Sequence, residues 1–391
     1  MKPTLIVADY PVGYASGFGE TLYNLFGGFP SEELWSAHPG HIAAAEGKRR
    51  GQSVHLPSPA RPRWLNNKAS YPLLKVQQFQ AAREAVRLLS EVVERNSIEN
   101  LLVVPVTPWI LSAALALHKR YPKLNLVFYV MDDWQGHHEC HQLPYSRWRQ
   151  RLLREAIDRA NTRFAVSREM AVHYEESFGK GWAVVHNGVS KSSVATETNG
   201  HKKPREVMLA GDVNVFRFDA VVAFAEAIER YNQRRSQTIE FKVMGEVAEQ
   251  HRAPLSGLKS AKLLSRRSHE ECLDAMKAAD MLYLPLAFCK RSARISLYSM
   301  PTKLPEYLAS GKSVFFHAPE ASAVFRVAER YDLTPRLATI DAQALDAFVE
   351  DWADGKQNGA DSPARATNAL AALDGEFDID TLARRFQSAF I

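Results

Sequence analysis

Short runs of apolar residues alternate along the chain with longer segments in which apolar residues recur every three or four positions. The short runs predict strands, and the longer segments predict amphipathic helices. Strands that alternate with helices are typical of parallel sheets covered by helices on both faces. The predicted strands are 4–8, 101–106, 126–130, 162–166 and 183–186 in the first half, and 206–210, 240–244, 262–264, 281–285 and 313–316 in the second. We therefore expect an α/β protein with two doubly wound sheets.

The longest helical pattern covers residues 76–96, with one apolar stripe of Phe79, Ala82, Val86 and Leu89. Such a stripe at helical spacing is expected to face a core. Residues 34–75 give no clear pattern, although they contain the proline-rich stretch 57–65.

A polar segment rich in small residues, 190–204, interrupts the alternation and has the composition of a linker. It predicts a first domain of residues 1–190 and a second of 191–378, two domains of ordinary size. The last residues, 379–391, place Leu382, Phe386 and Phe390 at helical spacing.

The composition excludes several classes of protein. With 46% hydrophobic and 24% charged residues in 391, the chain is expected to be soluble and globular. No apolar run approaches the ~20 residues of a membrane span. The first nine residues are too short and too quickly acidic for a signal peptide, so we expect a cytoplasmic protein. Cys140, Cys272 and Cys289 have no metal or redox spacing.

The net charge of +5 lies entirely in the first half, where 22 Lys and Arg face 17 Asp and Glu within residues 1–190. A basic half either favours an anionic surface, such as the cytoplasmic face of a membrane, or is ordinary surface variation. Because no stripe of aromatic and basic residues accompanies the charge, nucleic acid is not an expected partner.

The most informative segment is 299–312, which predicts a helix with clear start and stop signals. Pro301 and Pro305 suit the first positions of helical segments, where a missing N–H is no loss. Gly311 suits a left-handed cap before the predicted strand 313–316.

The same segment carries groups that suit a nucleoside diphosphate. The N–H groups of Thr302 and Lys303 would be free at a helix start, beside a hydroxyl and a cation, and such groups bind phosphate. Glu306, one turn later, is placed to accept hydrogen bonds from vicinal hydroxyls such as those of a ribose. The alternative is an ordinary amphipathic helix that begins with proline.

Residues 299–312 closely resemble the donor-site motif of GT-B glycosyltransferases, in particular those similar to family 4, in which a Pro-x-Lys-x-x-Glu-Tyr-Leu-Ala-x-Gly-Lys pattern precedes a strand. Residues 164–168 and the Val-His-Asn-Gly-Val turn at 185–189 resemble the end of that family's first domain. The resemblance implies two Rossmann-like domains facing across a cleft, with the helix at 379–391 packing back on the first domain. It also implies transfer of a sugar from a nucleoside diphosphate sugar to an acceptor hydroxyl.

Several residues of the second domain are expected at the donor site. Gly211 follows a strand directly, at the edge where such sheets bind ligands. Arg217 is a candidate partner of the leaving diphosphate, the alternative being a solvated loop arginine. Gly245 ends another strand, and Arg267 lies in the segment 266–270, which resembles the family's base-reading segment. The resemblance assigns the diphosphate to Thr302 and Lys303 and the ribose to Glu306.

The pattern also departs from the family. Many retaining members carry an acidic residue eight positions before the one that matches Glu306, and here that position is Tyr298. A cationic loop, 290–294, stands upstream of it. Family members also often place a Lys soon after the residue that matches Arg217, but 219–225 contains none. Whether the anomeric configuration is retained or inverted stays open.

In the first domain, Gly17 and Gly19 follow the first strand and allow close approach of a phosphate or an acceptor. Their spacing is too irregular for a nicotinamide site. Asp132 and Asp133 follow the strand 126–130 and are candidate catalytic groups, which would polarise an acceptor hydroxyl or stabilise positive charge at the sugar carbon. The alternative is a carboxylate that caps a turn.

The histidine-rich stretch 136–141 is too crowded for known zinc spacings. GT-B transferases generally need no metal, so the resemblance implies no cofactor besides the nucleoside diphosphate sugar as co-substrate. The acceptor is expected to be a glycan, a glycolipid or a small molecule, in cell-surface polysaccharide or glycolipid assembly.

A basic helix at 146–160 either rests on anionic lipid, as a peripheral contact at the inner face of the membrane, or packs its Trp and Leu residues into the core and leaves its arginines solvated. Two alternative functions remain open. One is a catalytically degenerate GT-B protein that binds nucleotide or glycan as a partner subunit, and the other is a sugar-nucleotide epimerase. The sugar, base and linkage are not specified by the sequence.

Overall fold

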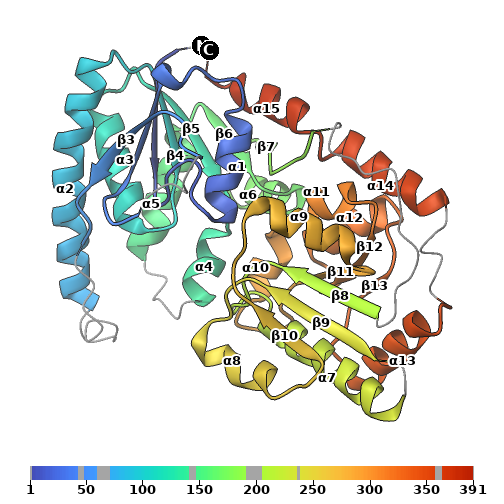
Figure 1. The fold of residues 1–391 in the computed structure, drawn as a ribbon. Helices are drawn as coiled ribbons and strands as arrows, with labels where there is room; N and C mark the ends of the chain where they lie inside the picture. Colours follow the sequence, from blue (N-terminus) through green and yellow to red (C-terminus); the bar gives the residue numbers. More distant parts are fainter. Residues whose placement is uncertain are drawn as a thin grey trace. The chain divides into compact units, whose positions relative to one another are not determined.

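A computed structural model of the chain describes residues 2–42, 48–59, 71–140, 147–190, 205–235, 238–356 and 363–390. The chain divides into two compact units. The first comprises Met1–Asn187 and Ile379–Ile391, and the second comprises Gly188–Asp378. The predicted linker at 190–204 lies outside the described residues, apart from Ser190. Each unit is built around its own parallel sheet (Figure 1).

The first unit contains a seven-stranded sheet in the order β3-β2-β1-β4-β5-β6-β7, in which neighbouring strands are parallel. The chain first adds strands on one side of β1 and then continues on its other side with β4. The reversal between β1 and β4 is the place where open α/β sheets bind ligands. The strands are β1 (Thr4–Ala8), β2 (Leu34–Pro39), β3 (Gln52–Leu56), β4 (Asn100–Val104), β5 (Asn125–Val130), β6 (Thr162–Ala165) and β7 (Ala183–Val184).

Helices cover both faces of this sheet. On one face, α1 and α15 bury Phe26 and Phe386 against strand residues such as Ile6 and Tyr129. On the other face lie α2, α3 and α5, which pack side by side (Figure 1). The helices of the first unit are α1 (Gly17–Leu25), the 3-10 turn η1 (Ser31–Glu33), α2 (Tyr71–Arg95), α3 (Pro108–Arg120), α4 (Trp134–Cys140), α5 (Arg147–Arg159), α6 (Arg168–Phe178) and α15 (Ile379–Gln387).

The second unit contains a six-stranded sheet in the order β10-β9-β8-β11-β12-β13, again with parallel neighbours. Its reversal lies between β8 and β11. The strands are β8 (Arg205–Ala210), β9 (Ile239–Met244), β10 (Ala261–Leu264), β11 (Met281–Pro285), β12 (Ser313–His317) and β13 (Arg336–Leu337). The helices are α7 (Phe218–Arg234), α8 (Glu249–Ser256), α9 (His269–Ala278), α10 (Ala293–Tyr298), α11 (Leu304–Ala309), α12 (Ala323–Arg330), α13 (Ala342–Ala353) and α14 (Pro363–Gly375).

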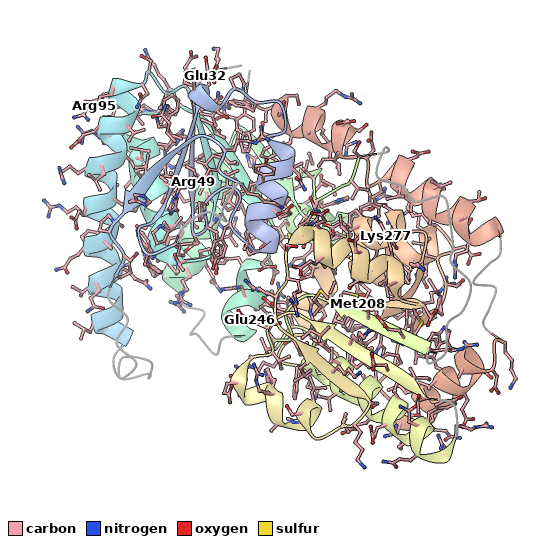
Figure 2. All side chains as sticks on the ribbon, in the orientation of Figure 1. Glu32, Arg49, Arg95, Met208, Glu246 and Lys277 are labelled. Atoms are coloured by element: carbon pink, nitrogen blue, oxygen red, sulfur yellow. The ribbon has the colours of Figure 1, made fainter. Side chains whose placement is uncertain are left out.

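The core of this unit is aromatic on one face, where Phe224 of α7 packs against Tyr283 and Phe315 of the sheet, beside α13. The helices α9, α11 and α12 cover the other face (Figure 1). Met208, in the middle of β8, is fully buried, whereas Lys277 points away from the sheet on α9 (Figure 2).

All ten predicted strands are confirmed, most of them to within a residue or two at each end. The sequence missed β2 and β3, in the stretch that gave no pattern, and the two-residue β13. β2 is buried along its whole length but includes polar Ser36 and His38, so it lacks an apolar run. β3 lies at the edge of the sheet and is mostly exposed. Part of the proline-rich stretch, from residue 60 on, lies outside the described residues.

The predicted stripe of the long helix needs a correction. The side chain of Phe79 is 66% exposed, and the buried face of α2 is formed mainly by small residues such as Ala82 and Ala85, followed by Leu89. Ala82 and Leu89 of the predicted stripe are buried as expected, whereas Phe79 and Val86 lie one position beyond the buried Gln78 and Ala85. Alanine carries a weak apolar signal, so the sequence pattern favoured Phe79 and Val86. The helix also begins earlier than predicted, at Tyr71.

Candidate nucleotide-sugar site

A tyrosine hydroxyl bonds the end of β8 at the reversal of the second sheet, between β8 and β11. β8 and β11 pair only at Val207 and Met208, so the N–H of Ala210, farther along β8, has no partner on β11. The hydroxyl of Tyr307 accepts this hydrogen bond at 2.7 Å. Tyr307 belongs to α11 and is fully buried, and burial raises the pKa of its phenol. The helix that carries Glu306 is thus attached to the end of the central strand.

Gly211 and Gly245 lie against each other at the carboxyl ends of β8 and β9. Gly211 adopts a φ of +140°, which favours glycine. A Cβ on Gly245 would lie 2.5 Å from the carbonyl carbon and oxygen of Gly211. Both positions therefore require glycine for the path of the backbone, and the sequence placed both at this edge.

Arg217 reaches back over this edge from the loop before α7. A Cβ on Gly211 would lie 3.1 Å from its Nη1 atom. The Nε atom of Arg217 is buried and has no hydrogen-bond partner among the described residues. Burial lowers the pKa of its guanidinium, an effect that nearby Tyr307, Asp212 and Tyr283 oppose. A half-buried cation with an unpartnered N–H is suited to bind an anion.

The loop after β11 is fixed at the same edge. The carboxylate of Asp219 accepts hydrogen bonds from the backbone N–H groups of Phe288 and Cys289, at 2.9 and 2.7 Å. The Ser292 hydroxyl donates to the carbonyl of Val215 at 2.7 Å. The cationic segment 290–294 therefore starts from an ordered backbone.

A pair that the sequence did not single out joins three strand ends. Asp212, after β8, accepts a bidentate contact from Arg266, which follows β10, and a hydrogen bond from the N–H of Glu246, after β9. These contacts lower the pKa of the Asp212 carboxyl, although its burial acts in the opposite direction. The predicted Arg267 lies next to this pair but is exposed, 3.7 Å from Glu271. Asp212 could have been predicted from the sequence, because it is an acidic residue that closely follows a predicted strand.

The donor motif differs from its predicted local structure in one respect. α11 begins at Leu304, whose N–H donates to the carbonyl of Pro301, so Thr302 and Lys303 lie in a turn before the helix and not in its first helical positions. Pro301 therefore does not start the helix, whereas Pro305 lies in its first turn. Gly311 adopts the predicted left-handed conformation, with a φ of +71°.

The side chains of this motif converge. Lys303 Nζ lies 2.7 Å from Glu306 Oε2, and the Glu306 side chain is only 10% exposed. Cys272 of α9 lies close enough to both residues for their charges to act on its thiol, whose pKa is raised mainly by burial. Glu306 Oε1 has no hydrogen bond to another described residue, so one oxygen of this nearly buried carboxylate is available to a ligand.

At the reversal of the first sheet, Asp9 fills the position next to β4. Its carboxylate accepts hydrogen bonds from the N–H groups of Val106 and Thr107, at 2.7 and 2.9 Å, at the start of α3. The predicted Gly17 is the first residue of α1, and Ser16 caps that helix by accepting from the N–H of Gly19. A Cβ on Gly19 would lie 2.3 Å from the backbone nitrogen of Tyr14, so Gly19 is required by the packing of the loop on itself.

The two predicted catalytic aspartates have different surroundings. Asp133 is buried, accepting hydrogen bonds from the N–H of Gly136 at 2.6 Å and from the hydroxyl of Tyr174 at 3.2 Å. This is the turn-capping arrangement that the sequence left open as an alternative. Asp132 keeps 23% of its side chain exposed, with His137 Nδ1 4.0 Å away. Burial and the neighbouring Asp133 charge raise the pKa of Asp132 to about 6.

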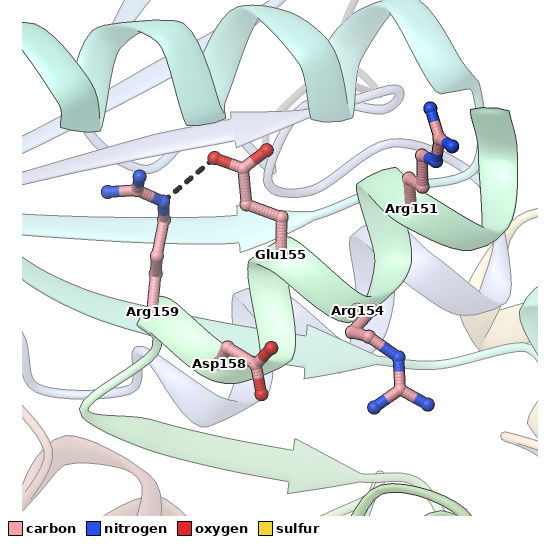
Figure 3. Close-up of a pocket in the computed structure, with 5 residues that line it drawn as sticks. All are labelled: Arg151, Arg154, Glu155, Asp158 and Arg159. Atoms are coloured by element: carbon pink, nitrogen blue, oxygen red, sulfur yellow. Dashed lines mark hydrogen bonds and ion pairs between the residues drawn. The ribbon is translucent and has the colours of Figure 1, made fainter.

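The basic helix α5 packs its apolar residues into the first unit. Leu152, Leu153 and Ile157 are buried, and Arg149 is buried with them. The exposed face borders an open hollow of about 440 Å³ (Figure 3). It is lined by Arg151, Arg154, Glu155, Asp158 and Arg159. Glu155 pairs within the helix with Arg159 at 2.8 Å, so part of the positive charge is balanced.

Within the described ranges, no helix is long and apolar enough to cross a membrane. Over the same ranges, no three His, Cys, Asp or Glu side chains are grouped so that they would hold a metal ion. The end of the histidine-rich stretch, from residue 138 on, has no described side chains.

Comparison with known proteins gives matches at the level of both sequence and fold. Residues 38–193 match the model of Glycosyltransferase Family 4. No curated protein sequence matches the chain.

Solved structures align with the chain from end to end. A sucrose-phosphate synthase from Thermosynechococcus elongatus is 12% identical, with a TM-score of 0.69 over 100% of this chain and 98% of that one. A lipopolysaccharide outer core galactosyltransferase is 13% identical, with a TM-score of 0.63 over 100% and 99%. An E. coli trehalose-6-phosphate protein bound with UDP-2-fluoro glucose is 12% identical, with a TM-score of 0.66 over 98% of each chain.

At these identities the structural likeness establishes the fold, and the family match covers the strands and helices from the end of β2 to β7. Together with the two parallel sheets, these findings confirm the resemblance that the donor motif predicted: the chain has the GT-B fold of the glycosyltransferases, and its residues 38–193 match family 4.

Proposed function

We propose that this protein transfers a sugar from a nucleoside diphosphate sugar to an acceptor hydroxyl. In this reaction the acceptor oxygen bonds to the anomeric carbon, the bond from that carbon to the diphosphate breaks, and the hydroxyl proton leaves to a base. The observation that carries the proposal is Arg217, a half-buried guanidinium whose buried Nε has no partner among the described residues, at the edge of the second sheet where such folds bind ligands.

The diphosphate is proposed to occupy the space above Gly211. Arg217 there offers N–H groups in a geometry that matches phosphate oxygens. An absent Cβ at Gly211 lets a phosphate approach the backbone. Lys303 adds a second cation, so the leaving group gains two positive partners as its charge develops.

The ribose is proposed to bind Glu306. Lys303 occupies Oε2 of this carboxylate, which leaves Oε1 to accept from the vicinal hydroxyls. The contact with Lys303 holds the side chain in place before the donor arrives. Asp212 and Arg266 are proposed to shape the neighbouring wall, where the base would lie near Gly245 and Arg267.

In the first unit, Asp132 is the stronger candidate of the two aspartates. Its carboxyl is partly exposed, and a pKa of about 6 suits a group that accepts a proton near neutral pH. Asp133 has its oxygens engaged by Gly136 and Tyr174, so we assign it the positioning of the loop that carries Asp132.

The first experiment is a thermal-shift titration of the wild type and Glu306→Ala with UDP, GDP, ADP and their sugars. At ~100 times its dissociation constant a ligand adds about 2.7 kcal/mol to stability, which is readily seen as a rise in Tm. A rise with one nucleotide family that disappears in Glu306→Ala supports the donor site. No rise with any nucleotide would exclude it.

A second candidate is a protein that binds the nucleotide without turnover. Two observations favour it: Tyr298 occupies the position of an acidic residue in many retaining relatives, and Asp133 is committed to a turn. Product analysis of the donor that binds separates the candidates. Transfer or slow release of free sugar indicates a transferase, isomerised donor without acceptor indicates an epimerase, and unchanged donor indicates a binding subunit.

For the acceptor we propose a glycan or glycolipid of cell-surface assembly, bound by the first unit. The exposed arginines Arg147, Arg151 and Arg154 of α5 give this unit a basic face that anionic lipid would attract. Because the apolar residues of α5 are buried, such a contact would be electrostatic and lost at high salt. Sedimentation with phosphatidylglycerol vesicles, with Arg151→Glu/Arg154→Glu as the matched variant, tests it, and equal binding by both proteins would exclude this helix.

A further inference from the structure

We propose that Tyr307 is a positioning residue that holds the two halves of the donor site, Glu306 on α11 and Arg217 over β8, in register. The inference rests on the proposed function, since it concerns the same site. It identifies a residue that touches no part of the donor and yet sets how tightly the donor binds.

The hydrogen-bonding geometry at the end of β8 leaves one N–H group for Tyr307. In a parallel strand, successive N–H groups point to opposite neighbours. The N–H of Gly211 donates to the carbonyl of Met244 on the β9 side, at 2.9 Å. The N–H of Ala210 therefore points to the β11 side, where pairing has already ended at Met208. Tyr307 supplies the acceptor that β11 does not.

Water does not provide a substitute for the Tyr307 hydroxyl as acceptor for the Ala210 N–H. Ala210 is 2% exposed and Tyr307 is fully buried, so water does not reach the pair directly. The same hydroxyl donates a longer hydrogen bond, of 3.4 Å, to the carbonyl oxygen of Ala210, so it contacts the peptide groups on both sides of this residue. Without the hydroxyl, the buried N–H of Ala210 would lose its partner. A shift of the strand end that brought this N–H to another acceptor or to water would then lower the free energy.

Such a movement would shift the two side chains proposed to bind the donor, Arg217 and Glu306. Ala210 precedes Gly211, whose φ of +140° sets the backbone beneath the Arg217 guanidinium. Tyr307 follows Glu306, whose carboxylate is held by Lys303. One hydrogen bond thus joins the two donor-binding side chains, which are 89 positions apart in the sequence.

The test variant is Tyr307→Phe, which keeps the ring and removes the hydroxyl. The matched control is Tyr129→Phe, which removes another fully buried hydroxyl, in the sheet of the first unit, where it donates to the carbonyl of Val185 at 2.7 Å. A role in stability alone would affect both variants in the same way.

Two measurements are made on the full chain, at a temperature well below the Tm of both variants. Hydrogen exchange reports the protection of the Ala210 amide without any ligand, and calorimetric titration reports the affinity for UDP, GDP and ADP. In Tyr307→Phe we expect the Ala210 amide to exchange about tenfold faster or more. We expect the bound nucleotide to lose about tenfold in affinity, which corresponds to about 1.4 kcal/mol. In Tyr129→Phe we expect both values to stay within about twofold of the wild type.

The proposal would be overturned by unchanged protection of Ala210 in Tyr307→Phe, or by faster exchange with unchanged nucleotide affinity. Equal losses of affinity in both tyrosine variants would also overturn it, because they would show a general effect of core destabilisation. If the wild type binds none of the three nucleotides, the proposed function fails on its own, and the exchange of Ala210 still decides whether Tyr307 holds the strand end.

Discussion

Replacing Arg217 with methionine should stabilise the protein while removing its affinity for nucleotide. Most substitutions destabilise a protein, by about 1 kcal/mol on average. Arg217 is expected to do the opposite because burial disfavours its charge and its Nε has no hydrogen-bond partner. Methionine has a similar length and adapts its shape, so the apolar part of the packing is kept.

The magnitude follows from what the guanidinium lacks. A buried polar group without a partner costs about 1–3 kcal/mol, more when it is charged. Removing that cost should raise the free energy of unfolding of the ligand-free protein by about 1–3 kcal/mol. For a domain of this size, Tm rises by about 2–4 °C per kcal/mol.

The assay is calorimetric unfolding of the wild type, Arg217→Met and Arg230→Met, with and without the nucleoside diphosphate that binds. Arg230 is a matched control because it belongs to the same unit but is paired with Asp346 at 2.8 Å. Its replacement should leave nucleotide binding intact and lower stability by up to about 1 kcal/mol, the usual value of a partly exposed ion pair.

A lower Tm for ligand-free Arg217→Met would refute the argument that this guanidinium is an unsatisfied buried charge. Nucleotide binding that survives the substitution would refute the assignment of Arg217 to the diphosphate. A higher Tm combined with lost binding is the result that we expect. It would show that the Arg217 side chain lowers the stability of the ligand-free protein and is needed for nucleotide binding.

Three further results are expected. Gly245→Ala places a Cβ 2.5 Å from the backbone of Gly211 and should cost about 1–3 kcal/mol in urea unfolding, whereas Gly181→Ala, in open space, should change little, and equal effects would contradict the packing argument. The folded state raises the pKa of Asp132 from 3.8 to about 6 and so binds its proton more tightly than the unfolded chain does. The free energy of unfolding should therefore fall by up to about 3 kcal/mol as pH rises from about 4 to about 6. If Asp132→Asn shows the same dependence of stability on pH, this residue is not the cause. Phe386→Ala removes a ring packed 5.1 Å from that of Phe26 and should cost about 3–5 kcal/mol, whereas Phe79→Ala should cost less than about 0.5 kcal/mol, and a large loss for Phe79→Ala would contradict its exposure.

Local sequence determined the elements of this fold wherever one residue type dominated a short run. Buried strands such as Thr4–Ala8 and Met281–Pro285 are recognisable because a parallel strand covered on both faces needs apolar residues throughout. β2 was missed because its polar Ser36 and His38 are buried with partners that only folding supplies, and the Ser36 hydroxyl oxygen accepts from the N–H of Val12 at 3.3 Å.

In the candidate site, too, some residues could be predicted from the local sequence and others only from the folded structure. The motif at 299–312 identified Lys303 and Glu306 because their chemistry is carried within one turn of chain. The contacts that position this motif come from distant residues: Tyr307 bonds Ala210, and Asp212 joins Arg266. No local pattern distinguishes Arg266 from its neighbour Arg267, since both are arginines in one loop.

The sequence by itself therefore determined the alternation of strands and helices, the two parallel sheets and the donor motif, because each depends on residues close together in the chain. Tertiary structure alone decided that Asp133 caps a turn while Asp132 stays partly exposed, and that the Nε of Arg217 is buried without a partner among the described residues. The physical reason is that burial and hydrogen bonding are set by neighbours in space. Asp133 accepts from Gly136 within its own turn, but its second partner, Tyr174, lies 41 positions away on α6.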